Sequence, residues 1–168
     1  NDAMPVDVTS LNGDVDASQA SFAAKGAITL DAQGGDLTAD GASLDTTSAS
    51  GKQVTLTASD AVDVTDATVD SSGTVAVTAD GGNLVATNAT VDTSSEYGMD
   101  VALTANDDVY VDDSTLRSDS GDLTADVTGT PPNSRTVYVD GATFVDANDR
   151  LAVSPNSVQI SGPNEKTE

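Results

Sequence analysis

The chain has 168 residues and a net charge of −22, with 28 acidic residues against six basic ones. It has no Cys, which excludes disulfides and thiol chemistry, and no run of about 18 apolar residues, which excludes a membrane-spanning helix. Because phosphates and anionic lipids attract basic residues, the charge also argues against a nucleic-acid partner and an anionic membrane surface.

The acidic residues are almost all Asp, 25 of the 28. Such a surface resembles that of proteins from salt-loving organisms, haloarchaea in particular, although an acidic protein from an ordinary habitat is the alternative. At about 1 M salt the Debye length is roughly 3 Å, so surface carboxylates hardly repel one another there. High charge with few aromatic residues is also typical of disorder, but strict alternation of Val, Leu and Thr favours an ordered fold.

Short strands with alternating apolar residues are predicted along the chain. The first contains Val6 and Val8, and the sixth contains Leu123 and Ala125. The four between them read AITLDA, QVTLTA, TVAVTA and DVALTA, at residues 27–32, 53–58, 74–79 and 100–105. Each therefore points one set of apolar side chains to a single face.

An ungapped block of eight residues follows each strand and occurs six times. It ends on an apolar residue, which we call the anchor: Phe22, Leu44, Val69, Val91, Leu116 and Phe144. The anchors are 22, 25, 22, 25 and 28 residues apart, and a Ser or Thr directly precedes each one. Apolar residues stand seven and five positions before each anchor, and Ala or Ser stands two before it. All variation in length therefore lies between the blocks.

A corner is predicted three positions before each anchor, at Gln19, Gly41, Asp66, Asn88, Asp113 and Gly141. Five of these six residues are Gly, Asn or Asp, which tolerate the left-handed backbone region better than other residues do. Each block is therefore predicted to form a strand, a one-residue corner and a second strand.

Three short strands in every 22–28 residues predict one coil of a parallel β-helix, with six to seven coils in all. At about 4.8 Å per coil the rod is roughly 30 Å long. A β-sandwich is the alternative, but it would not require an in-register repeat. We expect one solenoid domain over residues 1–161, with an exposed loop insert at 128–135 and a polar tail at 162–168. Neither end offers a capping helix, which favours a longer rod or end-to-end association.

The phrases GDLTADGASLDTTS, GGNLVATNATVDTSS and SGDLTADVT resemble the repeats of filamentous-haemagglutinin-type adhesins. The resemblance covers about residues 27–147. It implies a secreted, right-handed β-helix at a cell surface that serves adhesion or acts as a spacer. The chain departs from that family in its abundant Asp and uneven coil lengths, and it shows no recognisable secretion domain.

The residues directly after the anchors include Asp45, Asp70 and Asp92, followed one coil later by Arg117. Stacking predicts a column of carboxylates, which repel one another unless cations intervene. The functional interpretation is a Ca²⁺ or Na⁺ site, and the alternative is a solvated acidic face without a cofactor.

A second column, six positions before the anchors, ends in Val85, Tyr110 and Tyr138. This apolar strip on a polar strand indicates an interface, with local cross-strand stacking as the alternative. Asn88 lies in an N-glycosylation sequon, Asn-Ala-Thr, at an exposed corner.

These patterns predict a non-enzymatic, extracellular structural protein: a subunit of a cell-surface filament or an adhesin stalk. Self-association or contact with neighbouring solenoid segments is expected, with a surface glycan as a further partner. A carbohydrate-binding module or a viral tail-fibre segment is the alternative. A polysaccharide-degrading enzyme ranks last, because the available carboxylate pairs, Asp63/Asp66 and Asp112/Asp113, are weak evidence in a chain so rich in Asp.

Overall fold

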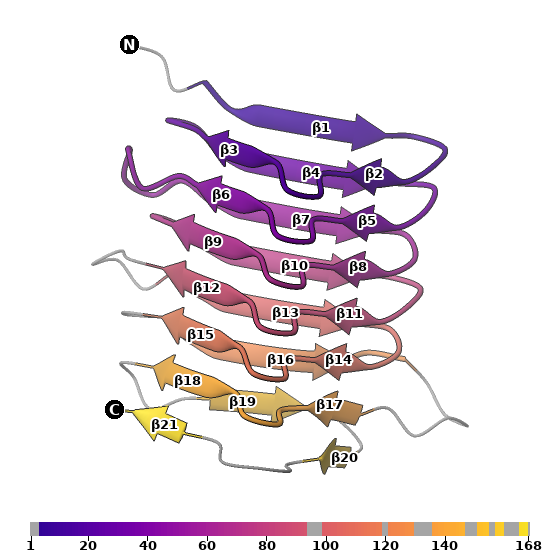
Figure 1. The fold of residues 1–168 in the computed structure, drawn as a ribbon, viewed down its shortest axis with the longest axis vertical. Coiled ribbons are helices and arrows are strands. Elements are labelled where there is room, and N and C mark those ends of the chain that lie inside the picture. Colours follow the sequence, from indigo (N-terminus) through magenta and orange to yellow (C-terminus); the bar gives the residue numbers. More distant parts are fainter. Residues whose placement is uncertain are drawn as a thin grey trace.

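The computed structural model of the chain is a parallel β-solenoid, in which three sheets run along one axis (Figure 1). The structure describes residues 4–93, 99–118, 121–129 and 136–146, and the backbone of strands at 151–154, 157–159 and 165–167. Each coil contributes one strand to each sheet before the chain moves on to the next level. The predicted fold class, an all-β parallel β-helix, is confirmed.

Each of the three sheets has seven strands. The first sheet consists of β1 (Val6–Ser10), β4 (Ile28–Ala32), β7 (Val54–Ala58), β10 (Val75–Ala79), β13 (Val101–Ala105), β16 (Leu123–Val127) and β19 (Leu151–Ser154). The second consists of β2 (Val15–Asp16), β5 (Leu37–Thr38), β8 (Val62–Asp63), β11 (Leu84–Val85), β14 (Val109–Tyr110), β17 (Thr136–Tyr138) and β20 (Ser157–Gln159). The third consists of β3 (Ser21–Ala23), β6 (Ser43–Asp45), β9 (Thr68–Ser71), β12 (Thr90–Thr93), β15 (Thr115–Ser118), β18 (Thr143–Asp146) and β21 (Glu165–Thr167).

The strands pair in parallel and in register, and the anchors show this most directly. Leu44 lies beside Val69, Val69 beside Val91, and Val91 beside Leu116. All four are at most 2% exposed, so the predicted row of buried anchors is confirmed. Loops of different length between the blocks therefore leave the register of the stack unchanged.

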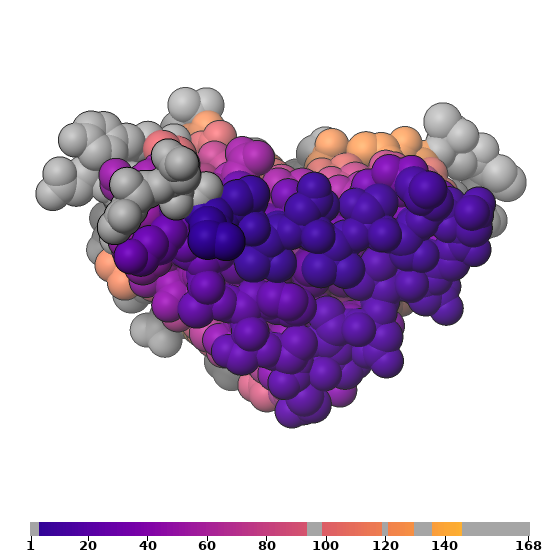
Figure 2. Space-filling view, turned by 90° about the horizontal axis from the view of Figure 1, so that it is seen from above, coloured from indigo at the N-terminus to yellow at the C-terminus, as the bar shows by residue number. Residues whose placement is uncertain are grey.

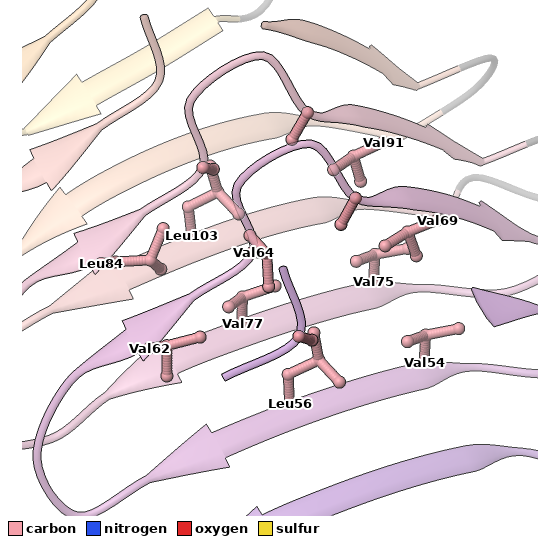
Figure 3. Close-up of a cluster of buried hydrophobic side chains, with 14 of the residues drawn as sticks. Val54, Leu56, Val62, Val64, Val69, Val75, Val77, Leu84, Val91 and Leu103 are labelled. Carbon is pink, nitrogen blue, oxygen red and sulfur yellow. The ribbon is translucent and has the colours of Figure 1, made fainter. Parts of the chain in front are cut away.

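The interior consists of Ala, Val and Leu side chains from all three sheets, together with Ile28 and Phe144 (Figure 3). Strand β10 illustrates the pattern, because Val75 and Val77 are buried while Ala76 and Thr78 between them are partly exposed. Complete burial of a Val or Leu side chain contributes about 1.5–3 kcal/mol. Side chains of this size fill the narrow interior, so the near absence of aromatic residues suits the fold.

The predicted corners have the backbone conformation that their residue types indicate. Positive φ angles of 54–69° occur at all six positions, among them Gln19 (58°), where the type of residue gave no such signal. At each of the first five corners the backbone N–H donates to a carbonyl of the next coil, as from Asn88 to Asp112 at 2.9 Å. The corner thus turns the chain without losing a hydrogen bond between coils.

The first coil and the last strands of the three sheets lie at opposite ends of the solenoid (Figure 1). Seen from above, the first coil, in indigo, lies over the N-terminal end of the solenoid, and the outline of the molecule narrows from one broad side to a point (Figure 2). At the other end the polar tail contributes strand β21, whose Glu165 pairs with Thr143 of β18. Most of the predicted loop insert at 128–135 lies outside the described residues.

Candidate functional site

The predicted acidic column lies on the outer face of the third sheet. Asp45 pairs with Asp70, Asp70 with Asp92, and Asp92 with Arg117, each in the register of the parallel strands. Because neighbouring residues of a strand face opposite sides, the buried anchors place these four side chains on the surface. The sequence therefore predicted the position of the column correctly.

The three carboxylates of this column have different electrostatic environments. The Oδ1 atom of Asp45 accepts hydrogen bonds from the hydroxyl (2.6 Å) and N–H (2.7 Å) of Thr47, and these lower the pKa of Asp45. Asp92 Oδ2 lies 3.5 Å from a guanidinium nitrogen of Arg117. Burial raises the pKa of Asp70, and the negative charge of Asp45 raises it further. The ionised form is thus disfavoured in the middle of the column.

A metal site in this column needs several oxygen ligands around one ion, and Ca²⁺ takes six to eight. Each of the three coils involved supplies one carboxylate to the column. Within the described part of the chain, no group of three or more His, Cys, Asp or Glu residues is arranged to hold a metal ion. Binding of Ca²⁺ or Na⁺ by Asp45, Asp70 and Asp92 therefore stays a prediction.

The predicted apolar strip lies on the outer face of the second sheet. Val85 pairs with Tyr110, and Tyr110 with Tyr138. The two tyrosine rings are stacked, with centroids 4.5 Å apart and planes within 2°. Each ring thus has one face against the other ring. This is the local cross-strand stacking that the sequence offered as the alternative to an interface. Its role as an interface stays a prediction.

Asn88 lies at an exposed corner with a φ of 54°, as the sequon interpretation requires. Its side-chain amide donates a hydrogen bond to Asp66, the corner residue of the preceding coil. The amide nitrogen is the atom that glycosylation would modify, and it already has a structural role. Glycosylation of Asn88 stays a prediction.

The carboxylate pairs weighed for acid–base chemistry have structural partners. Asp63 Oδ1 accepts from the hydroxyl (2.7 Å) and N–H (2.9 Å) of Thr65. Asp112 Oδ1 accepts from the N–H of Asp140 at 2.8 Å, and Asp66 accepts from Asn88. These bonds hold corners and neighbouring coils together.

A ladder of hydrogen bonds from backbone N–H groups to side-chain oxygens, which the sequence patterns did not predict, joins the coils just before the second sheet. It occupies the position eight before the anchors, where, at four of the five steps between coils, a side-chain oxygen accepts the backbone N–H of the same position one coil further on. The four bonds are Asp36 to Asp14 (3.0 Å), Ala61 to Asp36 (2.9 Å), Asp108 to Asn83 (3.0 Å) and Thr136 to Asp108 (2.8 Å), donor first. The recurrence of Asp and Asn at this position was the available signal.

A buried column of hydroxyl groups lies next to the acidic column, on the inner side of the third sheet. The sequence patterns did not predict it either. It consists of Thr46, Ser71, Thr93 and Ser118, all at most 1% exposed. The first two donate to the carbonyl of Lys52 (2.8 and 2.9 Å), and the last two to that of Met99 (3.1 and 3.0 Å). Lys52 and Met99 belong to the two coils of 25 residues, whose longer loops bring a carbonyl to each hydroxyl pair.

Comparisons with known proteins give no further identification: no family model, no curated protein and no solved structure matches the chain. Within the described residues, no helix has the length and hydrophobicity needed to cross a membrane. The structure thus defines a β-solenoid with an acidic column on the outer face of the third sheet and a tyrosine strip on that of the second.

Proposed function

We propose that the chain is a non-enzymatic structural segment of an extracellular surface, either a filament subunit or part of an adhesin stalk. One observation carries this proposal: three parallel sheets continue in register through every described coil. In such a stack each coil contacts its neighbours, so a rod can lengthen without any change in cross-section. The resemblance to filamentous-haemagglutinin-type repeats supports the same function at the level of the fold.

The surface charge supports a halophilic setting for this rod. A net charge of −22 on 168 residues produces strong self-repulsion at low ionic strength. Molar salt screens it, and we expect the solenoid to gain stability as sodium chloride is raised. The matching control is an equal osmolality of sucrose, which stabilises compact states without screening charge.

Antibodies raised against the purified chain test the location on cells of the source organism. We expect labelling of intact cells, and rods by electron microscopy of surface material prepared in molar salt. Labelling that requires lysis of the cells would contradict an extracellular role. Because this test reads location and shape, it does not depend on whether the purified chain associates with itself.

The tyrosine strip favours a second function, which is contact with a surface glycan or with a neighbouring solenoid. The side chains of Val85, Tyr110 and Tyr138 are half-buried and form an apolar strip on an otherwise polar face. We expect the Tyr110→Ser/Tyr138→Ser double variant to lose such binding, whereas Tyr110→Phe/Tyr138→Phe keeps the rings. Unaltered assembly and glycan binding in the Ser variant would exclude the strip as an interface.

A further inference from the structure

The stacked pair of Tyr110 and Tyr138 joins two neighbouring coils across the second sheet. The two residues lie one coil apart in the chain and directly opposite each other in the register of β14 and β17 (Figure 1). Their ring centroids are 4.5 Å apart, which is the close end of the range found for aromatic pairs. Both side chains are half-buried, so each ring contacts the other while part of it stays accessible to solvent. Two phenols of a single chain are thus held in contact.

Tyrosine is the side chain of this protein that most readily gives up a single electron. The chain has no Cys, Trp or His, and its two Met residues are oxidised to sulfoxides, which do not couple with one another. It has three tyrosines, of which Tyr97 lies outside the described residues. Tyr110 and Tyr138 are the other two, so the stack contains most of the phenol groups at which one-electron oxidation can occur.

A carboxylate lies beside the phenol group of Tyr110, where it can accept the phenol proton. The Tyr110 hydroxyl donates to Oδ2 of Asp108 at 3.4 Å, and the backbone N–H of Thr136 donates to Oδ1 of the same carboxylate at 2.8 Å. Burial and the negative charge of Asp108 raise the pKa of Tyr110, so its phenol is protonated at neutral pH. Removal of an electron from this phenol therefore also releases a proton, and Asp108 is positioned to take it.

The neighbours of Tyr110 along the solenoid axis determine where its radical can react. An oxidised phenol carries its unpaired electron partly on the two ring carbons next to the carbon that bears the oxygen. In the register of the second sheet, Val85 lies on one side of Tyr110 and Tyr138 on the other. Valine has no group that couples with such a radical, whereas the ring of Tyr138 is already in contact. Coupling within the chain is therefore favoured over coupling between chains.

We propose that Tyr110 and Tyr138 are a site of oxidative cross-linking, at which hydrogen peroxide, acting through a peroxidase, joins the two rings as dityrosine. Each phenol loses one electron and its O–H proton, and the rings turn out of their parallel stack. A carbon–carbon bond then forms between one ring carbon beside the oxygen of each tyrosine. The hydrogen on each joined carbon is replaced by one on the phenol oxygen, which restores both aromatic rings. In total the protein loses two hydrogens, and one hydrogen peroxide is reduced to two waters.

The cross-link would fasten two coils together at the longest step of the repeat, where the anchors are 28 residues apart. A covalent link that closes a long loop restricts the unfolded chain, so we expect the cross-linked protein to melt at a higher temperature. This inference goes beyond the proposed structural function, because it depends on the contact between the rings and not on where the chain is located.

The Tyr97→Phe variant tests the cross-link, because it leaves the stacked pair as its only tyrosines. After treatment with a haem peroxidase and hydrogen peroxide in dilute solution, we expect dityrosine fluorescence and a chain that is lighter by two hydrogens. Trypsin cleaves after Arg117 and Arg135, so the peptides of Tyr110 and Tyr138 separate unless they are linked. A linked pair of peptides from a chain that stays monomeric on a denaturing gel is the expected result.

Two further variants, both made in the Tyr97→Phe chain, serve as matched controls. Tyr138→Phe keeps both rings and lacks one phenol, so it should form no dityrosine within the chain. Asp108→Asn keeps the acceptor for Thr136 but cannot take the proton, and we expect it to cross-link about tenfold more slowly. Coupling that yields dimers at a rate rising with chain concentration would overturn the intramolecular site. Absence of dityrosine from the Tyr97→Phe chain, under conditions that couple free tyrosine, would overturn it as well.

Discussion

The carboxylate of Asp108 accepts a hydrogen bond of 2.8 Å from the backbone N–H of Thr136, which occupies the same position in the next coil. Asp14 and Asp36 each make the equivalent bond to the coil that follows them. The short side chain of Asp readily reaches nearby backbone groups. Part of the acidic content thus serves the stacking of coils and would be needed at any salt concentration.

Asp108→Ala removes the carboxylate that accepts the backbone N–H of Thr136, a buried residue. We expect a loss of about 1–3 kcal/mol in the free energy of unfolding. Asp108→Asn retains the Oδ1 acceptor and removes the charge, so it should stay close to the unmodified protein in urea titrations. The hydroxyl of Tyr110 also donates to Asp108, at 3.4 Å, and Tyr110→Phe controls for that contact. Equal losses in the Ala and Asn variants would show that charge, and not the hydrogen bond, matters here.

Ala61 interrupts the ladder, because its methyl group cannot accept the N–H of Asn83 in the next coil. Ala61→Asn supplies an acceptor at that level without adding charge. We expect a gain of about 0.5–1.5 kcal/mol, the typical net contribution of one hydrogen bond. Ala61→Val adds volume without an acceptor and should bring no such gain. The melting temperatures of the three proteins in molar salt provide the comparison.

The repeat made the core and the corners predictable from sequence, because each depends on residue types at a fixed distance from an anchor. Leu44 and Val69 are buried since every second residue of a strand faces inward, and Gly41 and Asn88 turn the chain since both tolerate a positive φ. Gln19 adopts the same φ of 58° although its type gives no signal. Its position in the repeat was the better guide.

The contacts between coils were harder to predict, because they join a side chain of one coil to a backbone group of another. The bond from Ser71 to the carbonyl of Lys52 depends on the path of a loop, and no periodic pattern records that path. The acidic column was predicted, but burial of Asp70 was not, because the packing around it decides its exposure. The stacking geometry of Tyr110 and Tyr138 likewise depends on ring orientation.

The corner at Asn88 predicts a strong dependence on residue type. Both Asn88→Val and Asn88→Gly lose the hydrogen bond to Asp66, but a β-branched residue also avoids the left-handed region, so Asn88→Val should be about 1–3 kcal/mol less stable than Asn88→Gly. Both variants also remove the sequon, which Thr90→Ala removes without touching the corner. Chemical denaturation measures the stability, and the mass of chain isolated from the source cells reports glycosylation. A stable Asn88→Val variant would contradict the role of the corner.

The melting temperature of the chain tests whether the acidic column binds calcium. If Asp45, Asp70 and Asp92 bind calcium, then millimolar calcium raises the melting temperature of the unmodified chain at constant ionic strength. The rise should disappear in Asp92→Asn and persist in Asp126→Asn, which alters an acidic residue of the first sheet. A melting temperature unchanged by calcium would leave the solvated acidic face as the explanation.

Asp70→Asn tests the electrostatics of the column through its dependence on pH. Burial and the charge of Asp45 raise the pKa of Asp70 in the folded protein, so its ionised form destabilises the fold at neutral pH. Removing the charge should therefore stabilise the protein by about 0.2–1 kcal/mol, as for a like-charged pair directly opposite on neighbouring strands.

When the pH falls through the raised pKa of Asp70, the folded state of the unmodified protein takes up a proton more readily than the unfolded state does. The difference in the free energy of unfolding between the variant and the unmodified protein should thus shrink upon acidification. The pKa of Asp45 is lowered, so Asp45 loses its stabilising bonds to Thr47 only at lower pH, and it does so in both proteins. Urea titrations from pH 7 to pH 3 measure the difference, and an advantage that is constant over this range would show that Asp70 has an ordinary pKa.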